Sequence, residues 1–163
     1  MRRSSDLTRV SVPGAYLHAK MPEGKRLLLK LRGQFVDIMC NVNPEYRSYV
    51  RVEKEVKVLY LRLLRALYGC LESALLWYEL YSSTLVSMGF KLNPYDLCVA
   101  NKIIDGSRCT ITFYVDDNKI SHKRPEVVKR VISELEQHFG KLTVKSDVKH
   151  FNFFVFLDVD IHS

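Results

Sequence analysis

The stretch CTITFYVDD, residues 109–117, decides how this chain is interpreted, because it runs from an apolar segment into two adjacent carboxylates. Its first part is rich in β-branched and aromatic residues, which is typical of a β-strand. The next residues, NKIS at 118–121, can return beside that strand. Asp116 and Asp117 are therefore expected at the tip of a hairpin.

The aspartate pair needs a counter-charge or water. Two neighbouring carboxylates repel each other, and burying them bare would cost several kcal/mol. Mg²⁺ suits them, since it takes oxygen ligands, retains water and bridges carboxylates to substrate phosphates, which indicates phosphoryl transfer. A plainer interpretation stands beside this one, because Asp-Asp in a turn is common and is usually just solvated. The flanking sequence has to decide between them.

The composition describes a basic globular chain. Its 163 residues, 47% of them hydrophobic, are enough for one domain with a core. Lys and Arg number 25 against 18 Asp and Glu, and the resulting charge of +7 favours contact with polyanions such as nucleic acid. No apolar stretch is long enough for a signal peptide or a membrane span, so we expect a soluble intracellular protein of the cytoplasm or nucleus, with no membrane partner.

The cysteines fit the same setting. None of the four belongs to a C-x-x-C pair, and each lies among apolar residues. We therefore expect reduced core thiols rather than disulfides or zinc ligands at Cys40, Cys70, Cys98 and Cys109.

Hydrophobic spacing predicts two helices. Apolar residues keep a helical period over residues 71–88, and Gly89 supplies the stop. A second helix is expected from Pro125 through Phe139, ended by Gly140. Its inward face is predicted to consist of Val127, Val128, Val131, Leu135 and Phe139.

Strands are expected around these helices. Asp105-Gly106 is a strong hairpin signal between strands at 96–104 and 108–115. Further strands are predicted at 8–17, where Pro13-Gly14 breaks the strand, at 56–64, at Thr143 and at 155–161. Residues 151–157 are expected to form a buried strand. Residues 25–36 are expected to form a strand or the edge of a helix, and residues 41–45 a loop. Helices beside an antiparallel sheet describe an α+β fold.

Four segments occur in the order and spacing of one known family. They are VPGAYLH at 12–18; LYG at 67–69 with Ser73 and WYE at 77–79; GF at 89–90 with YDLCV at 95–99; and YVDD at 114–117. Together they resemble the reverse transcriptase domain of copia-type LTR retrotransposons, over about residues 10–161. The resemblance implies a polymerase palm-like antiparallel sheet with helices packed on one face, and it makes residues 1–163 a partial domain from the first palm motif onward.

The resemblance also implies an activity. The family is an RNA-directed DNA polymerase, a nucleotidyltransferase that uses two Mg²⁺ ions, with Mn²⁺ as an alternative, and takes an RNA or DNA template, a primer and deoxynucleoside triphosphates. Asp116 would be the principal metal ligand and Asp117 its neighbour in the same catalytic site. Lys141 or Lys145 would lie near the nucleotide's phosphates.

Three further residues would form the nucleotide site by the same resemblance. Tyr16 would lie under the incoming sugar and discriminate deoxyribose from ribose; alternatively it is a core tyrosine beside a strand. Tyr68 and Gly69 would form part of the nucleotide and template floor, where glycine permits close approach; alternatively they are the turn before a helix. Trp77 and Tyr78 keep helical spacing and are expected in the helix core.

One position departs from the family pattern at the site itself. The first palm strand of the family supplies a carboxylate facing the Asp-Asp hairpin, and here that position is Ser11. A hydroxyl is neutral and a poor bridging ligand, so catalysis should fall by orders of magnitude. By the resemblance, we expect the chain to lack most of the fingers segment and the RNase H and integrase regions of a parent polyprotein. We therefore expect an impaired polymerase palm fragment, with a non-catalytic nucleic-acid-binding remnant or a degenerate pseudogene product as the alternatives.

Overall fold

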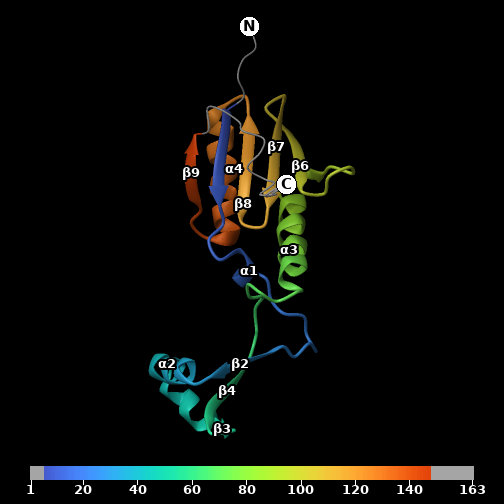
Figure 1. Cartoon of the computed structure of the whole chain (residues 1–163). Coiled ribbons are helices and arrows are strands. Elements are labelled where there is room, and N and C mark those ends of the chain that lie inside the picture. Colours follow the sequence, from blue (N-terminus) through green and yellow to red (C-terminus); the bar gives the residue numbers. More distant parts are fainter. Residues whose placement is uncertain (1–5, 148–163) are drawn as a thin grey trace, which may run out of the picture. The chain divides into compact units, whose positions relative to one another are not determined.

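A computed structural model describes residues 6–147 of the chain. The chain divides into two compact units, which we call the large unit (residues 1–15 and 78–163) and the small unit (residues 16–77) (Figure 1). Both contain antiparallel strands and helices, so the expected α+β class is confirmed at this level. The strands predicted at 151–157 and 155–161 lie outside the described residues.

Within residues 6–147, the large unit is built on a six-stranded antiparallel sheet (Figure 1). The strand order is β5-β6-β7-β8-β1-β9, so the N-terminal strand β1 is inserted between the hairpin strand β8 and the last strand β9. The strands are β1 (Asp6–Ser11), β5 (Lys91–Leu92), β6 (Val99–Ile104), β7 (Ser107–Tyr114), β8 (Asp117–His122) and β9 (Thr143–Asp147).

Helices α3 (Ser73–Ser87) and α4 (Pro125–Phe139) cover one face of this sheet. Tyr81 of α3 is fully buried, with its ring centroid 5.0 Å from that of Phe113 in β7 and 5.5 Å from that of Phe139 in α4. All five residues predicted to face inward from α4 are buried. Side chains alternate along a strand, so Tyr114 and Asp117 point to the opposite face, which we call the site face.

Turn chemistry explains the β6–β7 hairpin. Asp105 and Gly106 both have positive φ, 49° and 70°, as a type I′ turn requires, and the predicted hairpin is confirmed. β6 starts at Val99 rather than at Asp96. The reason is local: the Asp96 carboxylate accepts a hydrogen bond from the Cys98 backbone N–H at 2.9 Å, which favours a turn over a strand.

The small unit contains, among its described residues, a three-stranded antiparallel sheet in the order β2-β4-β3. Its strands are β2 (Leu28–Arg32), β3 (Arg51–Glu53) and β4 (Val56–Arg62). Helix α2 (Gln34–Val42) and the 3₁₀ helix η1 (Pro44–Tyr49) accompany the sheet. The core of the unit is Val36 and Cys40 from α2 against Leu59 of β4.

Several sequence predictions need correction. The strand expected over 8–17 ends at Ser11, because Gly14 takes a positive φ of 63° and residues Ala15–His18 form the short helix α1. The loop expected at 41–45 is divided between the end of α2 and the start of η1, with the Asn43 side chain capping the latter by accepting from the Glu45 N–H. The predicted helices, β4 and the strand at Thr143 are confirmed.

The four cysteines differ in burial. All four are free thiols; Cys40 and Cys109 are buried as expected, whereas Cys70 and Cys98 are partly exposed, so they are not core residues. Burial raises the pKa of the Cys109 thiol to about 11. In the part of the chain that the structure describes, every helix is too short or too polar to cross a bilayer.

Candidate functional site at the β7–β8 hairpin

The hairpin tip is a strained two-residue turn. Tyr114 pairs with Asp117, which leaves Val115 and Asp116 between the strands. Val115 has a φ of 50°, a conformation that a β-branched side chain rarely adopts. A positive φ at the first turn position is the mark of a type II′ turn, where glycine is usual. The chain therefore holds Asp116 in place at a conformational cost.

Ser11 lies directly against this turn. It is the last residue of β1, and it pairs with Asp117 across the β1–β8 ladder. Its hydroxyl donates a hydrogen bond of 2.9 Å to Oδ2 of Asp116, and the next N–H, from Val12, donates to the Asp116 carbonyl at 2.8 Å. Ser11 is buried. A side chain at position 11 is thus placed to share a ligand with Asp116.

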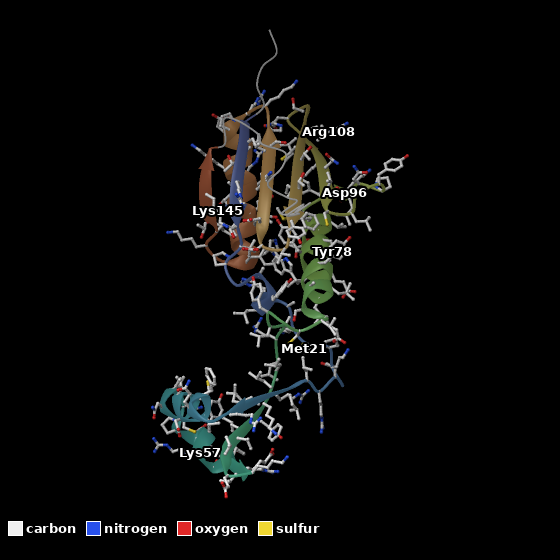
Figure 2. All side chains as sticks on the ribbon, in the orientation of Figure 1. Met21, Lys57, Tyr78, Asp96, Arg108 and Lys145 are labelled. Atoms are coloured by element: carbon white, nitrogen blue, oxygen red, sulfur yellow. The ribbon has the colours of Figure 1, made fainter. Side chains whose placement is uncertain are left out.

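Asp117 is held by two cations of the same chain. Arg9 Nη2 lies 2.6 Å from Oδ2 of Asp117, and Lys145 Nζ lies 2.9 Å from Oδ1. Arg9 precedes Ser11 by two residues on β1 and so shares its face. Lys145 is on β9, at the edge of the sheet (Figure 2). Each oxygen of this carboxylate therefore already has a charged donor.

The pKa of Asp117 reflects this environment. Partial burial acts to raise the pKa, but the hydrogen bonds and positive charges of Lys145 and Arg9 outweigh it and lower the pKa below its usual value. Asp117 is ionised at neutral pH.

A buried amide supports the turn from the helix side of the sheet. Asn118 is fully buried, and its Nδ2 donates to the Asp116 carbonyl at 3.1 Å. Its Oδ1 has no hydrogen-bond partner within the described residues. A buried acceptor without a partner lowers the free energy of unfolding, so Asn118 fixes the turn at a cost in stability.

The donor set does not fit a pair of divalent cations. Two Mg²⁺ ions about 3.5 to 4 Å apart need several bridging carboxylates. Here Asp116 shares one oxygen with a neutral hydroxyl, and both oxygens of Asp117 are taken by cations. Across residues 6–147, no cluster of three or more His, Cys, Asp or Glu side chains is arranged to hold a metal.

The predicted nucleotide-site residues Tyr16, Tyr68 and Gly69 come together in the small unit. The rings of Tyr16 and Tyr68 lie with centroids 4.3 Å apart and planes tilted by 37°. Gly69 has a φ of 90°, and a Cβ added there would meet open space. Glycine is therefore favoured at position 69 by its backbone conformation rather than by crowding.

Ser73 explains the spacing of the LYG motif. It is almost fully buried, and its hydroxyl donates to the Leu67 carbonyl at 2.7 Å and accepts from the Leu67 N–H at 3.0 Å. This pair of bonds ties the turn at Tyr68 and Gly69 to the first residue of α3. Trp77 is buried as predicted, whereas Tyr78 is half-buried.

The two lysines predicted near the nucleotide's phosphates have different surroundings. Lys141 is exposed, and Lys145 is bound to Asp117. Arg9 was not predicted as a site residue. Its position two residues before Ser11 is the signal that finds it, because alternate residues of a strand share a face.

Comparison with known proteins adds no relative. The sequence matches no protein-family model and no curated protein. The fold and the site by themselves define a mixed α+β protein with two antiparallel sheets, whose acidic hairpin is fastened by a serine on one side and by two cations on the other.

Proposed function

We propose that the chain is a palm fragment of a copia-type reverse transcriptase, an RNA-directed DNA polymerase by descent whose nucleotidyl transfer is strongly impaired as it stands. The motifs at 12–18, 67–79 and 114–117 suggest the family. An antiparallel sheet with two helices on one face and an Asp-Asp hairpin on the other is compatible with a palm. Template, primer and deoxynucleoside triphosphates would be the partners of the competent ancestor.

One observation carries this proposal. The hydroxyl of Ser11 lies 2.9 Å from Oδ2 of Asp116, at the end of the strand that pairs with the hairpin. A carboxylate in the same place would face Asp116 and complete a three-carboxylate site for Mg²⁺. Serine supplies a hydrogen-bond donor to Asp116 in place of a negative charge, which supports descent from a two-metal site together with loss of its activity.

Restoring the carboxylate tests the proposal. Ser11→Asp is compared with Ser11→Asn, because asparagine has the size of aspartate without its charge. Mn²⁺ binding is followed by electron paramagnetic resonance. We expect Ser11→Asp to gain Mn²⁺ affinity slightly, by less than about threefold while Arg9 and Lys145 still pair with Asp117, and to lose that gain when Asp116→Asn is added. Wild-type primer extension should be at the level of Asp116→Asn on RNA and DNA templates. Extension by the wild type that Asp116→Asn abolishes would contradict the proposed impairment.

A second candidate function, non-catalytic nucleic-acid binding, is favoured by a surface of the small unit. One face of its sheet carries Lys30, Arg32, Arg51 and Arg62 around Tyr60, and we call it the basic sheet face. These side chains are exposed, whereas the other face packs on α2. The small unit has eleven Lys and Arg against six Asp and Glu, so it holds +5 of the chain's net charge of +7. Glu53 on the same face pairs with Lys30 and accepts a hydrogen bond from the Tyr60 hydroxyl, so Arg32, Arg51 and Arg62 are the cations of this face that suit a phosphate backbone.

Salt-dependent binding separates this candidate from a chain with no retained role. Fluorescence anisotropy with a primer-template duplex should show an affinity that falls steeply between 50 and 200 mM salt. Arg32→Gln with Arg62→Gln should weaken binding about tenfold and reduce the salt slope. The matched control is Lys123→Gln with Lys129→Gln, exposed cations of the large unit whose loss changes the net charge equally. Equal effects of the two pairs would reject the basic sheet face, and no binding at 50 mM salt would favour a degenerate product.

A further inference from the structure

Asp117 is neutralised by a guanidinium and an ammonium that contact different oxygens. Arg9 lies 2.6 Å from Oδ2, and Lys145 lies 2.9 Å from Oδ1. Both distances are typical of charge-assisted hydrogen bonds. Asp117 is three-quarters buried, so these contacts are shielded from water better than an ordinary surface pair. A metal ion that approached either oxygen of Asp117 would meet a positive charge already bonded to that oxygen.

A bulge in β9 brings Lys145 to this position. Val144 pairs with Val10 and Ser146 pairs with Arg9, so Lys145 is the extra residue on β9. β9 is separated from β8 by β1, yet the lysine side chain spans that strand to reach Asp117. Bulges commonly redirect a side chain in this way beside functional sites. The contact is therefore built into the register of the sheet and does not depend on a chance surface rotamer.

The charges of the two aspartates and of the two cations bonded to Asp117 sum to zero, and Lys119, which lies opposite Arg9 in the β1–β8 register and interacts electrostatically with Asp117, adds a third positive charge on the same face. Asp116 and Asp117 supply two negative charges, and Arg9 and Lys145 supply two positive charges within hydrogen-bond distance of Asp117. A divalent cation gains little from such a site, because the carboxylates attract it while the two nearby cations repel it. Replacing Ser11 by a carboxylate would change this sum by a single unit.

We infer that Arg9 and Lys145 act as built-in counter-ions of Asp117 and close the hairpin to divalent metal independently of Ser11. This inference rests on the proposed descent of the hairpin from a metal site. Replacing Ser11 by a carboxylate alone then gives only a small gain in metal affinity, and removing the two cations raises that affinity whether or not Ser11 is replaced. In this inference, Arg9 and Lys145 supply the positive charge that bound metal would otherwise supply to the hairpin.

Mn²⁺ affinity in a set of variants of the full chain tests the inference. The set comprises Ser11→Asp alone, Arg9→Gln with Lys145→Gln, and the three changes combined. We expect Ser11→Asp alone to gain less than about threefold in affinity and the combined variant to gain at least about tenfold more, because two nearby repulsive charges are gone. In the Ser11→Asp background, Lys141→Gln is the matched control, an exposed lysine four residues before Lys145, and should change affinity less than about twofold.

Two results would overturn the inference. Equal Mn²⁺ affinity in Ser11→Asp and in the combined variant would show that the cations do not oppose metal, while the proposed palm site would stand. In the combined variant, Lys145→Arg keeps the positive charge that Lys145→Gln removes. Equal Mn²⁺ affinity with either change at position 145 would show that this charge is not what opposes the metal. If no variant shows a gain in Mn²⁺ affinity that Asp116→Asn removes, the proposed function is rejected, and the inference with it.

A folding control keeps the test decisive. If Ser11→Asp does not fold, Arg9→Gln with Lys145→Gln in the Ser11 background replaces it. Addition of Mn²⁺ should then raise the thermal unfolding midpoint of this double variant and leave those of the wild type and Lys141→Gln unchanged. A double variant that is indifferent to Mn²⁺ would overturn the inference.

Discussion

The Ser11 hydroxyl donates a hydrogen bond to Oδ2 of Asp116, and it does so from the final residue of β1. Together with the Val12 N–H bond to the Asp116 carbonyl, it fastens the β7–β8 turn to the neighbouring strand at two points. The position that could carry a third carboxylate thus has a structural use in the present chain. The same geometry gives the Asp116 carboxylate a hydrogen-bond donor from within the chain.

Ser11→Ala should destabilise the protein by about 1 kcal/mol, because a partly buried carboxylate oxygen loses its donor. The measurement is the free energy of unfolding from urea titration at neutral pH. Ser83→Ala is the matched control: Ser83 is exposed on α3, its hydroxyl bonds the helix backbone, and its loss should change the free energy by less than about 0.5 kcal/mol. Equal losses in the two variants would show that the Ser11 bond contributes nothing specific.

Asp117 should make stability depend on pH below neutrality. Burial raises its pKa, but Lys145 and Arg9 lower it more, so the pKa in the folded protein is below the unfolded value of about 3.9. The unfolded state then binds the proton first. The stabilisation is fully present above the unfolded pKa and is lost as pH falls through the folded pKa.

Asp117→Asn should therefore flatten the acid limb of the stability profile. Urea midpoints at pH 7, 5, 4 and 3 measure it, and the gap between the wild type and Asp117→Asn should be largest at pH 7 and shrink toward pH 3. Glu79→Gln, an exposed carboxylate of α3, should leave the shape of the profile unchanged. A gap that stays constant from pH 7 to pH 3 would show that the pKa of Asp117 is not lowered by folding.

The turn at Val115 should be relieved by glycine. A β-branched residue at a φ of 50° costs about 1–2 kcal/mol, more than glycine loses through its greater freedom in the unfolded chain. Val115→Gly should therefore raise the free energy of unfolding by up to about 1 kcal/mol. The control has the opposite sign: Val86→Gly, at an exposed position of α3, should lower it by about 1 kcal/mol. A loss of stability in both variants would mean that the turn is not strained.

The elements that the sequence predicted are those with strong local signals. The amphipathic face of α4, the Asp105-Gly106 hairpin and the stop of α3 at Gly89 all follow from the periods and turn residues of short segments, and the structure bears them out. The position of Ser11 beside the hairpin followed from motif alignment. The segment-based features need no knowledge of distant partners, whereas the placement of Ser11, 105 residues from Asp116 in sequence, came from the family resemblance alone.

The counter-ions of Asp117 could not be predicted in the same way. Arg9 and Lys145 are 108 and 28 residues from Asp117 in sequence, and their meeting depends on β1 lying between β8 and β9. The bulge that directs Lys145 is a property of register, which no local pattern in residues 143–147 reveals. Long-range pairing therefore decides the electrostatics of the site, while local patterns decide its scaffold.

Asn118→Asp should be the most damaging conservative change at the hairpin. The new side chain has the same shape, but it replaces the donor of the 3.1 Å bond to the Asp116 carbonyl with an oxygen and places a carboxylate in a fully buried position. Burial would raise the pKa of that carboxyl, so its folded pKa exceeds the unfolded one. The loss should be about 3 kcal/mol or more at pH 7 and should diminish as pH falls through the raised folded pKa toward the unfolded value of about 3.9, below which the group is neutral in both states. The control is Asn101→Asp. Position 101 is partly exposed, and an aspartate there keeps the oxygen that accepts the hydrogen bond from the Thr110 hydroxyl, so the free energy of unfolding should fall by less than about 1 kcal/mol. Similar urea midpoints for the two variants at pH 7 would show that Asn118 is not needed to hold the Asp116 turn.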